Sequence, residues 1–201
     1  MSEIAQKTKN IAVLTSGKSR GSNFCAIHNW FQEHKIPVRI SFVTVNNPHA
    51  PIIEKCNEFN INHIYLSTKD MVKFEHELLT LTSKHNIELI VLAGFLKKLS
   101  VSFIRDFGKP ILNIHPALLP KYGGQGMYGL RVHQAVFAAR EKESGVTVHL
   151  VNEDYDAGET VVQQKIYIGD CHTPEEIAAR VLRLEHQIYA PTIWKILSKG
   201  R

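Results

Sequence analysis

Short hydrophobic runs alternate with amphipathic segments along the first half of the chain. Short apolar runs, typical of buried strands, occur at residues 11–15 and 89–93, and further strands are expected at 38–45 and 63–66. Between them, apolar residues recur with helical spacing, which predicts helices over 23–34, over 51–59 and from Met71 onward. This alternation of strand and helix is typical of an open parallel sheet covered by helices.

The next strand, residues 111–115, differs because it carries polar side chains. Pro116 removes a backbone donor and should end it. Asn113 and His115 are two positions apart, so in an extended strand they lie on the same face. An amide can donate to a developing oxyanion, and an imidazole can supply a proton near neutral pH. The alternative is a polar strand end in which His115 caps the turn.

The pattern changes after Ala139. Polar and apolar residues alternate over 145–151, and 160–168 is rich in β-forming residues, which predicts hairpin-like pairing. Thr173, Pro174 and Glu176 mark the start of a last helix, which we expect Pro191 to interrupt. The chain therefore predicts an α/β fold: an open, mostly parallel, Rossmann-like sheet with helices on both faces and an antiparallel C-terminal strand portion.

Composition narrows the possible partners. The 201 residues suffice for one full core, so we expect a disordered lead-in over 1–9 and a single domain over 10–201. The net charge of +5 comes without a dense basic stripe, which argues against nucleic acid and leaves a phosphorylated small molecule. The polar first ten residues and the short apolar runs indicate no membrane and a cytoplasmic location.

The cysteines indicate reduced thiols. Cys25, Cys56 and Cys171 are far apart in the sequence, and no C-x-x-C motif occurs. Neither a zinc site nor a disulfide framework is therefore expected, and we expect no metal.

Ligands of parallel sheets lie outside the carboxyl ends of the strands. The first such end, residues 17–23, is glycine-flanked, carries Lys18 and Arg20 and leads into a helix, which favours an anion site as much as an ordinary turn. At a second end, Gly94 either lets a ligand approach the backbone or belongs to a plain turn. The glycine-rich residues 121–129 are either a mobile cover or a passive surface loop.

An acidic turn follows the alternating strand. An Asp beside His115 would favour the imidazolium and raise the pKa of His115 above its usual value. The local sequence does not say which of Glu153, Asp154 or Asp156 would do so.

Several separated motifs resemble the folate-dependent formyltransferases. They are LNIHPALLPKY at 112–122, SGVTVH at 144–149 and DYDAG at 154–158, together with GSNF at 21–24, AGF at 93–95 and EHQIYAP at 185–191. The resemblance covers nearly everything after Asn10. It implies that a formyl group moves from 10-formyltetrahydrofolate to the amine of glycinamide ribonucleotide in purine synthesis. It implies neither a metal nor a covalent enzyme intermediate.

The resemblance also implies site residues. The catalytic residues would be Asn113, His115 and Asp156. The residues expected to bind the ribonucleotide and its phosphate are Gly21, Ser22, Asn23, Leu182, Arg183, Leu184 and Glu185, with Glu185 meeting the substrate amine. The residues expected to bind folate are Leu96, Lys97, Lys98, Leu99, Asn113, Asn152, Glu153, Asp154, Tyr155 and Asp156. Two departures from the family pattern are the Lys18-Ser19-Arg20 link and the long glycine-rich loop.

Three alternatives stay open. A formyltetrahydrofolate hydrolase would use water as the nucleophile, but we expect an N-terminal regulatory domain there. A transformylase acting on tRNA or a sugar nucleotide would be expected to carry a C-terminal extension. A non-catalytic phosphate-ligand binder would leave the combination of Asn113, His115 and Asp156 unexplained. We expect small-molecule substrates and a monomer or weak homodimer.

Overall fold

The computed structural model describes residues 7–17 and 20–199. The strands of the described chain are β1 (Lys9–Leu14), β2 (Val38–Val45), β3 (His63–Tyr65), β4 (Leu89–Leu92), β5 (Ile111–His115), β6 (Glu143–Leu150) and β7 (Thr160–Tyr167). The helices are α1 (Ser22–Glu33), α2 (Ile52–Glu58), α3 (Met71–Lys84), α4 (Val101–Phe107), α5 (Leu130–Ala138) and α6 (Pro174–Lys199). The sequence pattern predicts neither α4 nor α5.

The strands form one seven-stranded sheet in the order β3-β2-β1-β4-β5-β6-β7. The first five strands pair in parallel, and β6 and β7 are antiparallel, which confirms the predicted fold class. The chain adds β2 and β3 on one side of β1 and then β4 and β5 on the other. A sheet whose order reverses in this way opens a crevice at the carboxyl ends of the strands beside the reversal.

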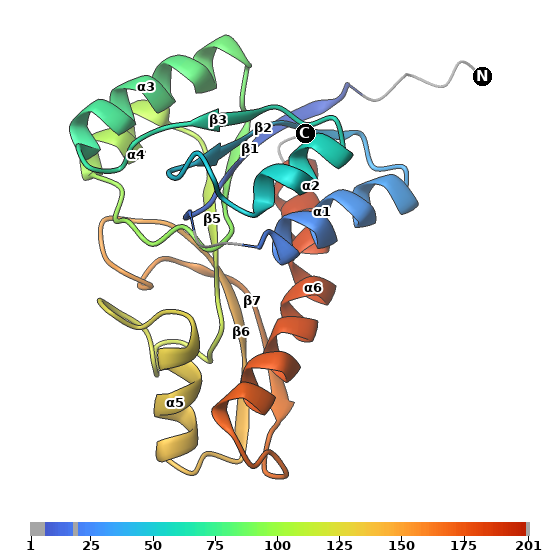
Figure 1. Ribbon diagram of the computed structural model, residues 1–201, viewed down its shortest axis with the longest axis vertical. Coiled ribbons are helices and arrows are strands. Elements are labelled where there is room, and N and C mark those ends of the chain that lie inside the picture. Colours follow the sequence, from blue (N-terminus) through green and yellow to red (C-terminus); the bar gives the residue numbers. More distant parts are fainter. Residues whose placement is uncertain (1–6, 18–19, 200–201) are drawn as a thin grey trace.

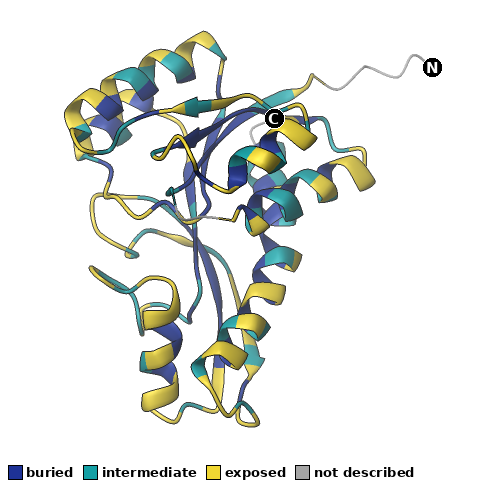
Figure 2. Cartoon of the chain, viewed as in Figure 1, coloured by how far each residue is buried: buried dark blue, intermediate teal, exposed yellow. Residues whose placement is uncertain are grey.

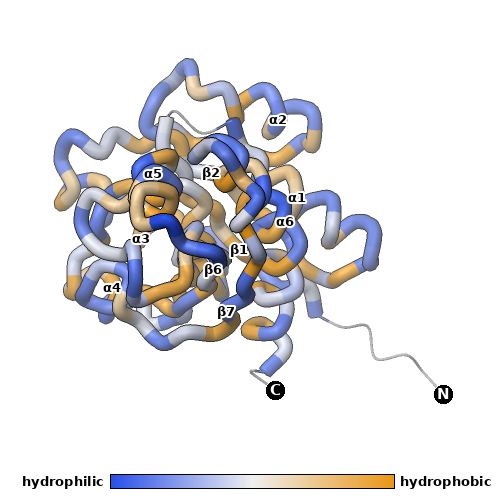
Figure 3. Tube along the Cα trace, turned by 90° about the horizontal axis from the view of Figure 1, so that it is seen from below, coloured by the Kyte–Doolittle hydropathy of each residue, from blue (hydrophilic) through white to orange (hydrophobic). Residues whose placement is uncertain are grey.

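Both faces of the sheet are covered by helices (Figure 1). Ile11 and Val13 of β1 pack into a cluster with residues of α1, α2, α5 and α6. Ala12 and Leu14 point the other way, into a second cluster with residues of α3 and α4. The inner strands are therefore largely buried on both sides, whereas the edge strands β3 and β7 are partly exposed. The other exposed residues lie mainly on the outer sides of the helices and in loops (Figure 2), where much of the chain is hydrophilic (Figure 3). Within the described residues, no helix has the length and apolar character needed to cross a membrane.

The sheet begins earlier than the hydrophobic pattern suggests. Lys9 opens β1, where it aligns with Val38, and its ammonium lies 2.6 Å from the Glu88 carboxylate. This residue therefore belongs to the sheet rather than to the expected lead-in. Residues 1–6 lie outside the described part of the chain.

Helix α6 begins as predicted but does not end at Pro191. The Thr173 hydroxyl accepts the Glu176 amide at 3.2 Å, as in a capping box. The helix continues through Pro191 to Lys199, so the expected interruption is wrong. A proline inside a helix costs about 3 kcal/mol. Burial on both sides of it offsets that cost, and the buried neighbours include Ile188, Tyr189, Ile193 and Leu197.

The Tyr189 side chain links α6 to β4 and to β5, the strand that carries Asn113 and His115. This side chain is 1% exposed. Its hydroxyl lies 2.8 Å from the carbonyl of Leu92, the last residue of β4, and 3.1 Å from the carbonyl of Leu112, the second residue of β5. One buried hydroxyl thus couples the helix to both strands.

Replacing Tyr189 with Phe should lower the free energy of unfolding by about 1–3 kcal/mol, because a buried polar contact is lost without a replacement. Urea unfolding of the two proteins measures the difference. Tyr167→Phe is the matched control, because Tyr167 is 59% exposed and the change should stay within about 0.5 kcal/mol. Equal effects at both positions would contradict the proposed coupling.

Candidate active site

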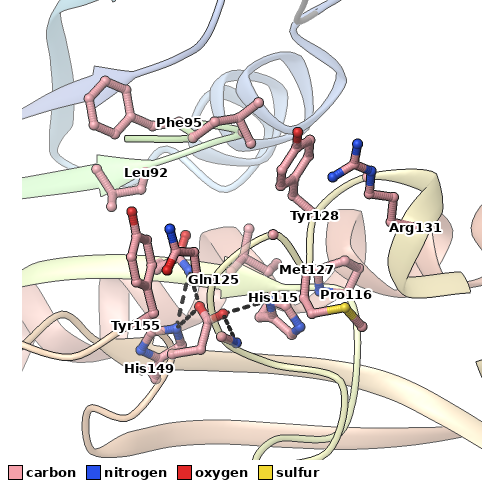
Figure 4. Close-up of a pocket in the computed structure, with 18 of the residues that line it drawn as sticks. Leu92, Phe95, His115, Pro116, Gln125, Met127, Tyr128, Arg131, His149 and Tyr155 are labelled. Carbon is pink, nitrogen blue, oxygen red and sulfur yellow. Dashed lines mark hydrogen bonds and ion pairs between the residues drawn. The ribbon is translucent and has the colours of Figure 1, made fainter. Parts of the chain in front are cut away.

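A cavity of about 690 Å³ lies outside the carboxyl ends of β4 and β5. Residues from segments 94–99, 113–116, 124–131 and 151–156 line it, together with Ala178, Leu182 and Glu185 of α6. Figure 4 shows part of this lining. The predicted site residues among its walls are Asn23, Leu96, Lys97, Lys98, Leu99, Asn113, His115, Asn152, Asp154, Tyr155, Asp156, Leu182 and Glu185. Residues separated by up to 162 positions are therefore brought to one cavity.

Five predicted residues do not line this cavity: Gly21, Ser22, Glu153, Arg183 and Leu184. Helical geometry accounts for Leu184. Leu182 and Glu185 are three residues apart and share the face of α6 toward the cavity, whereas Leu184 packs into the core. Gly21 and Ser22 lie at the start of α1, and Gly21 has a left-handed φ of 78° there. Lys18 and Ser19 of the predicted anion turn lie outside the described residues.

Asn113 contacts two groups that come from the antiparallel part of the chain. β5 aligns Asn113 with His149 of β6, and the Asn113 Nδ2 lies 3.1 Å from His149 Nε2. The same Nδ2 lies 3.4 Å from Asp156 Oδ1. His149 Nδ1 lies 2.9 Å from the Leu150 carbonyl, to which only a protonated Nδ1 can donate. His149 Nε2 also lies 3.5 Å from Asp156 Oδ1, so Asn113 and Asp156 meet at this nitrogen.

Sequence reasoning gave His149 no role. Its signal would have been its place as the one histidine of the alternating run 145–151. That run does not reveal which β5 residue it faces, because the antiparallel register depends on the 35 residues that separate Asn113 from His149.

His115 is held from both ring nitrogens. Its Nε2 lies 2.8 Å from the Tyr122 carbonyl and donates to it. Its Nδ1 lies 3.5 Å from Asp156 Oδ2 (Figure 4). The side chain is 4% exposed, so the ring has little freedom. Because Nε2 is hydrogen-bonded to the Tyr122 carbonyl, Nδ1 is the ring nitrogen that faces the Asp156 carboxylate and the cavity.

Asp156 is the acidic residue of its turn that reaches His115. Its backbone is left-handed, with φ 53°, an uncommon conformation for a residue other than glycine. The Gly124 amide donates to its Oδ2 at 2.9 Å. Gly123 packs close beside it: a Cβ there would lie 3.3 Å from the Asp156 Cβ and 2.5 Å from Leu119 Cδ2. A side chain at residue 123 would therefore push the segment away from Asp156.

The predicted rise in the pKa of His115 is wrong for this structure. Burial lowers the pKa of His115, and it outweighs the Asp156 charge and the Tyr122 carbonyl, which both raise it. His149 lowers it further. Nearby His133 is also buried, and desolvation together with His115 lowers its pKa to about 4. The site therefore holds neutral imidazoles more readily than the sequence suggested.

The carboxylate of Asp156 behaves in the opposite way. Burial alone would raise its pKa, but His149, His115 and the Gly124 amide together hold the pKa of Asp156 below its usual value. The site thus keeps one buried anion beside two imidazole rings.

A second carboxyl group faces the cavity from α6. The Asn23 Nδ2 donates to Glu185 Oε2 at 2.6 Å, and the Glu185 side chain is 8% exposed. Burial raises the pKa of Glu185 to about 7, although the Asn23 hydrogen bond acts to lower it. Within the described structure, Asn23 Oδ1 is buried with no hydrogen-bond partner. This pair therefore offers acceptors to a ligand that carries an amine.

The remaining walls are suited to a flat, partly apolar ligand. Leu92 and Phe95 are nearly buried, and Lys98 lies over the Tyr155 ring at 5.4 Å. Arg131 lies over the Tyr128 ring at 5.1 Å on another wall (Figure 4). Among the residues that the structure describes, no cluster of His, Cys, Asp or Glu has the makings of a metal site.

Asp156→Asn should lower the pKa of His115 further, because the charge that favours the imidazolium is removed while the shape is kept. NMR titration of the His115 ring measures the shift. Asp154→Asn is the control, since its backbone amide bonds Asn152 and no contact joins its carboxylate to His115. A pKa of His115 that does not change in Asp156→Asn would refute the pairing.

Glu185→Gln should change how stability depends on pH. Between the unfolded pKa of about 4.3 and the folded pKa of about 7, the folded protein keeps a proton that the unfolded chain has released. Wild-type stability should therefore fall on the order of 2–3 kcal/mol from pH 5 to pH 8 through this group.

Urea unfolding of wild type and Glu185→Gln at both pH values tests this. The advantage of the wild type over the variant should be larger at pH 5 than at pH 8. Glu159→Gln, at an exposed carboxylate, should show no such difference. A wild-type advantage that is the same at both pH values would rule out a protonated Glu185.

Comparisons with known proteins identify the family of the chain. The formyl transferase family model matches residues 9–193. The chain is 33% identical to phosphoribosylglycinamide formyltransferase of Bacillus subtilis, over 94% of this chain and 95% of that protein. It is 34% identical to the chloroplastic phosphoribosylglycinamide formyltransferase of Arabidopsis thaliana, over 94% of this chain, and it spans 66% of the length of that relative.

Solved structures give the same answer. The phosphoribosylglycinamide formyltransferase of Coxiella burnetii, in complex with CHES, superimposes with a TM-score of 0.84 at 34% identity. The match covers 97% of this chain and 89% of that chain. With the family model matching nearly its whole length, the chain belongs to the formyl transferase family.

Proposed function

We propose that this protein transfers a formyl group from 10-formyltetrahydrofolate to the amine of glycinamide ribonucleotide, in purine synthesis. One observation carries the proposal. A hydrogen-bond donor set, Asn113 and His115 with Asp156, shares a cavity with the acceptor pair of Asn23 and Glu185. Formyl transfer needs both: donors for the carbonyl oxygen and acceptors for the attacking amine. The names of the relatives above support this reading.

The reaction needs no covalent intermediate on the protein. The amine nitrogen attacks the formyl carbon, and the carbonyl oxygen becomes an oxyanion in a tetrahedral intermediate. The bond between that carbon and N10 of the folate then breaks, N10 takes a proton, and the new amide loses one. Holding two substrates in one cavity supplies part of the rate enhancement.

Asn113 and His115 are the proposed oxyanion donors. The Asn113 amide and the His115 Nδ1 both lie beside the Asp156 carboxylate and line the cavity. Burial lowers the pKa of His115 in the free site, but negative charge developing on the substrate oxygen favours the imidazolium. Asp156 stabilises that charge and would pass protons through water.

The two substrates would occupy different walls. Leu96–Leu99 and Asn152–Asp156 are proposed to hold the pterin, with Tyr155 offering an aromatic face. Asn23, Leu182 and Glu185 are proposed to hold the ribonucleotide. With a pKa of about 7, Glu185 can take up a proton from the substrate ammonium near neutral pH and leave an amine that can attack. Gly21, Ser22, Arg183 and Leu184 stay proposals on the same side.

The setting of the protein is also a proposal. Free Cys25, Cys56 and Cys171 suit a reducing cytoplasm. A single domain over residues 10–201, a monomer or weak homodimer, and the absence of nucleic-acid partners stay predictions from the sequence.

The direct test supplies 10-formyltetrahydrofolate with glycinamide ribonucleotide, and with water alone. Formyl transfer should depend on the amine acceptor, and deformylation that is equally fast without it would replace the proposal with a hydrolase. His115→Ala and Asp156→Asn should each lower kcat by about 100-fold or more, because a preorganised donor is lost. Asp106→Asn, at an exposed carboxylate on α4, should retain wild-type kcat.

A further inference from the structure

Segment 121–124 contacts both members of the His115–Asp156 pair through its backbone. The Tyr122 carbonyl accepts from His115 Nε2 at 2.8 Å. The Gly124 amide donates to Asp156 Oδ2 at 2.9 Å. The orientation of both side chains therefore depends on where this short stretch of backbone lies.

The backbone of Tyr122 is in an uncommon conformation. Its φ is 58°, in the left-handed region that side chains other than glycine rarely adopt. This conformation is what directs the Tyr122 carbonyl toward His115. Such a residue persists only where its surroundings hold it.

Two contacts hold Tyr122. Its ring is half-buried against the larger hydrophobic cluster. Its hydroxyl donates to Glu141 Oε1 at 2.9 Å, and the Lys121 ammonium lies 3.1 Å from the same oxygen. Lys121 is 72% exposed, so solvent weakens its contribution, whereas the Glu141 side chain is 29% exposed. The hydroxyl bond is therefore the main polar restraint on the ring.

We propose that Glu141 is a positioning residue for His115, acting through the Tyr122 hydroxyl and the Tyr122 backbone carbonyl. The proposal rests on the function proposed above. Glu141 lies between α5 and β6 and does not line the cavity. It acts by keeping the Tyr122 carbonyl on Nε2, so that Nδ1 faces Asp156 and the cavity.

The charges around His115 set the direction of the expected effect. The groups that face it are Asp156 across Nδ1, His149 from β6 and His133 from α5. The Tyr122 carbonyl adds to the effect of Asp156 and favours the protonated ring. Loss of the carbonyl contact should therefore lower the pKa of His115 and let the ring rotate.

Three variants isolate the chain of contacts. Tyr122→Phe removes the hydroxyl and keeps the ring, and Glu141→Ala removes its acceptor. Glu141→Gln keeps a neutral acceptor at the same place and should restore part of the effect. The matched control is Glu143→Ala, which removes an exposed carboxylate that pairs with Lys165 across β6 and β7 at 3.1 Å.

Two measurements are made on each folded variant. NMR titration of the labelled His115 ring should show a lower pKa in Tyr122→Phe and Glu141→Ala, with a smaller change in Glu141→Gln. Formyl transfer should show kcat lowered about threefold to tenfold, as expected for one hydrogen bond, with KM for both substrates little changed. The alkaline limb of the kcat profile should shift to lower pH. Glu143→Ala should match the wild type in both measurements.

The double variant Tyr122→Phe with Glu141→Ala should be no worse than the worse single variant, because both break one contact chain. A His115 titration unchanged in the single variants overturns the positioning role, even where wild-type formyl transfer is intact. Equal changes in Glu143→Ala also overturn it, because they would show a general charge effect. If the wild type transfers no formyl group, the proposed function fails, and the NMR titration still decides whether Glu141 positions His115.

Discussion

The site depends on keeping the Asp156 carboxylate charged in a place where little water reaches it. A buried anion is costly unless hydrogen bonds and opposite charge surround it. Here those partners come from three parts of the chain: Asn113 of β5, His149 of β6 and the Gly124 amide of segment 121–124. His115 completes the set at 3.5 Å. Moving β5, β6 or segment 121–124 would remove one partner of the carboxylate. Because Asp156 must stay charged, the relative positions of these three elements are restricted.

The cavity holds a second carboxyl group in the opposite state. Glu185 is buried as Asp156 is, but its polar partner is a neutral amide, Asn23. Desolvation therefore dominates and raises the pKa of Glu185 to about 7, whereas the imidazoles and the backbone amide keep the pKa of Asp156 low. Groups with separated pKa values are what proton transfer between two substrates needs. The difference between the pKa values of Glu185 and Asp156 follows from the groups around each carboxyl and not from the residue type.

Much of the fold could be predicted from the sequence, because inner strands such as β4, which is buried along its whole length, leave short continuous apolar runs. The shared face of Asn113 and His115 followed from the two-residue period of a strand. Asp156 could be chosen over Glu153 and Asp154 only through the family resemblance, because a left-handed backbone at Asp156 leaves no local signature. Likewise, the passage of α6 through Pro191 and the lowered pKa of His115 both depend on burial by distant residues, which no local pattern reports.

The antiparallel course of β6 explains why the acidic turn reaches the site at all. Leu112 aligns with Val91 of β4 on one side and with Leu150 of β6 on the other. β4 ends one residue after Val91, and β6 ends at Leu150, so both strands leave the sheet at nearly the same level. The turn after β6 therefore emerges beside the crevice left by β4. β5 runs on to His115, which extends past the end of β4 into the space that this turn covers. A parallel β6 would instead have needed a crossover connection before it, and its register would not have set His149 opposite Asn113.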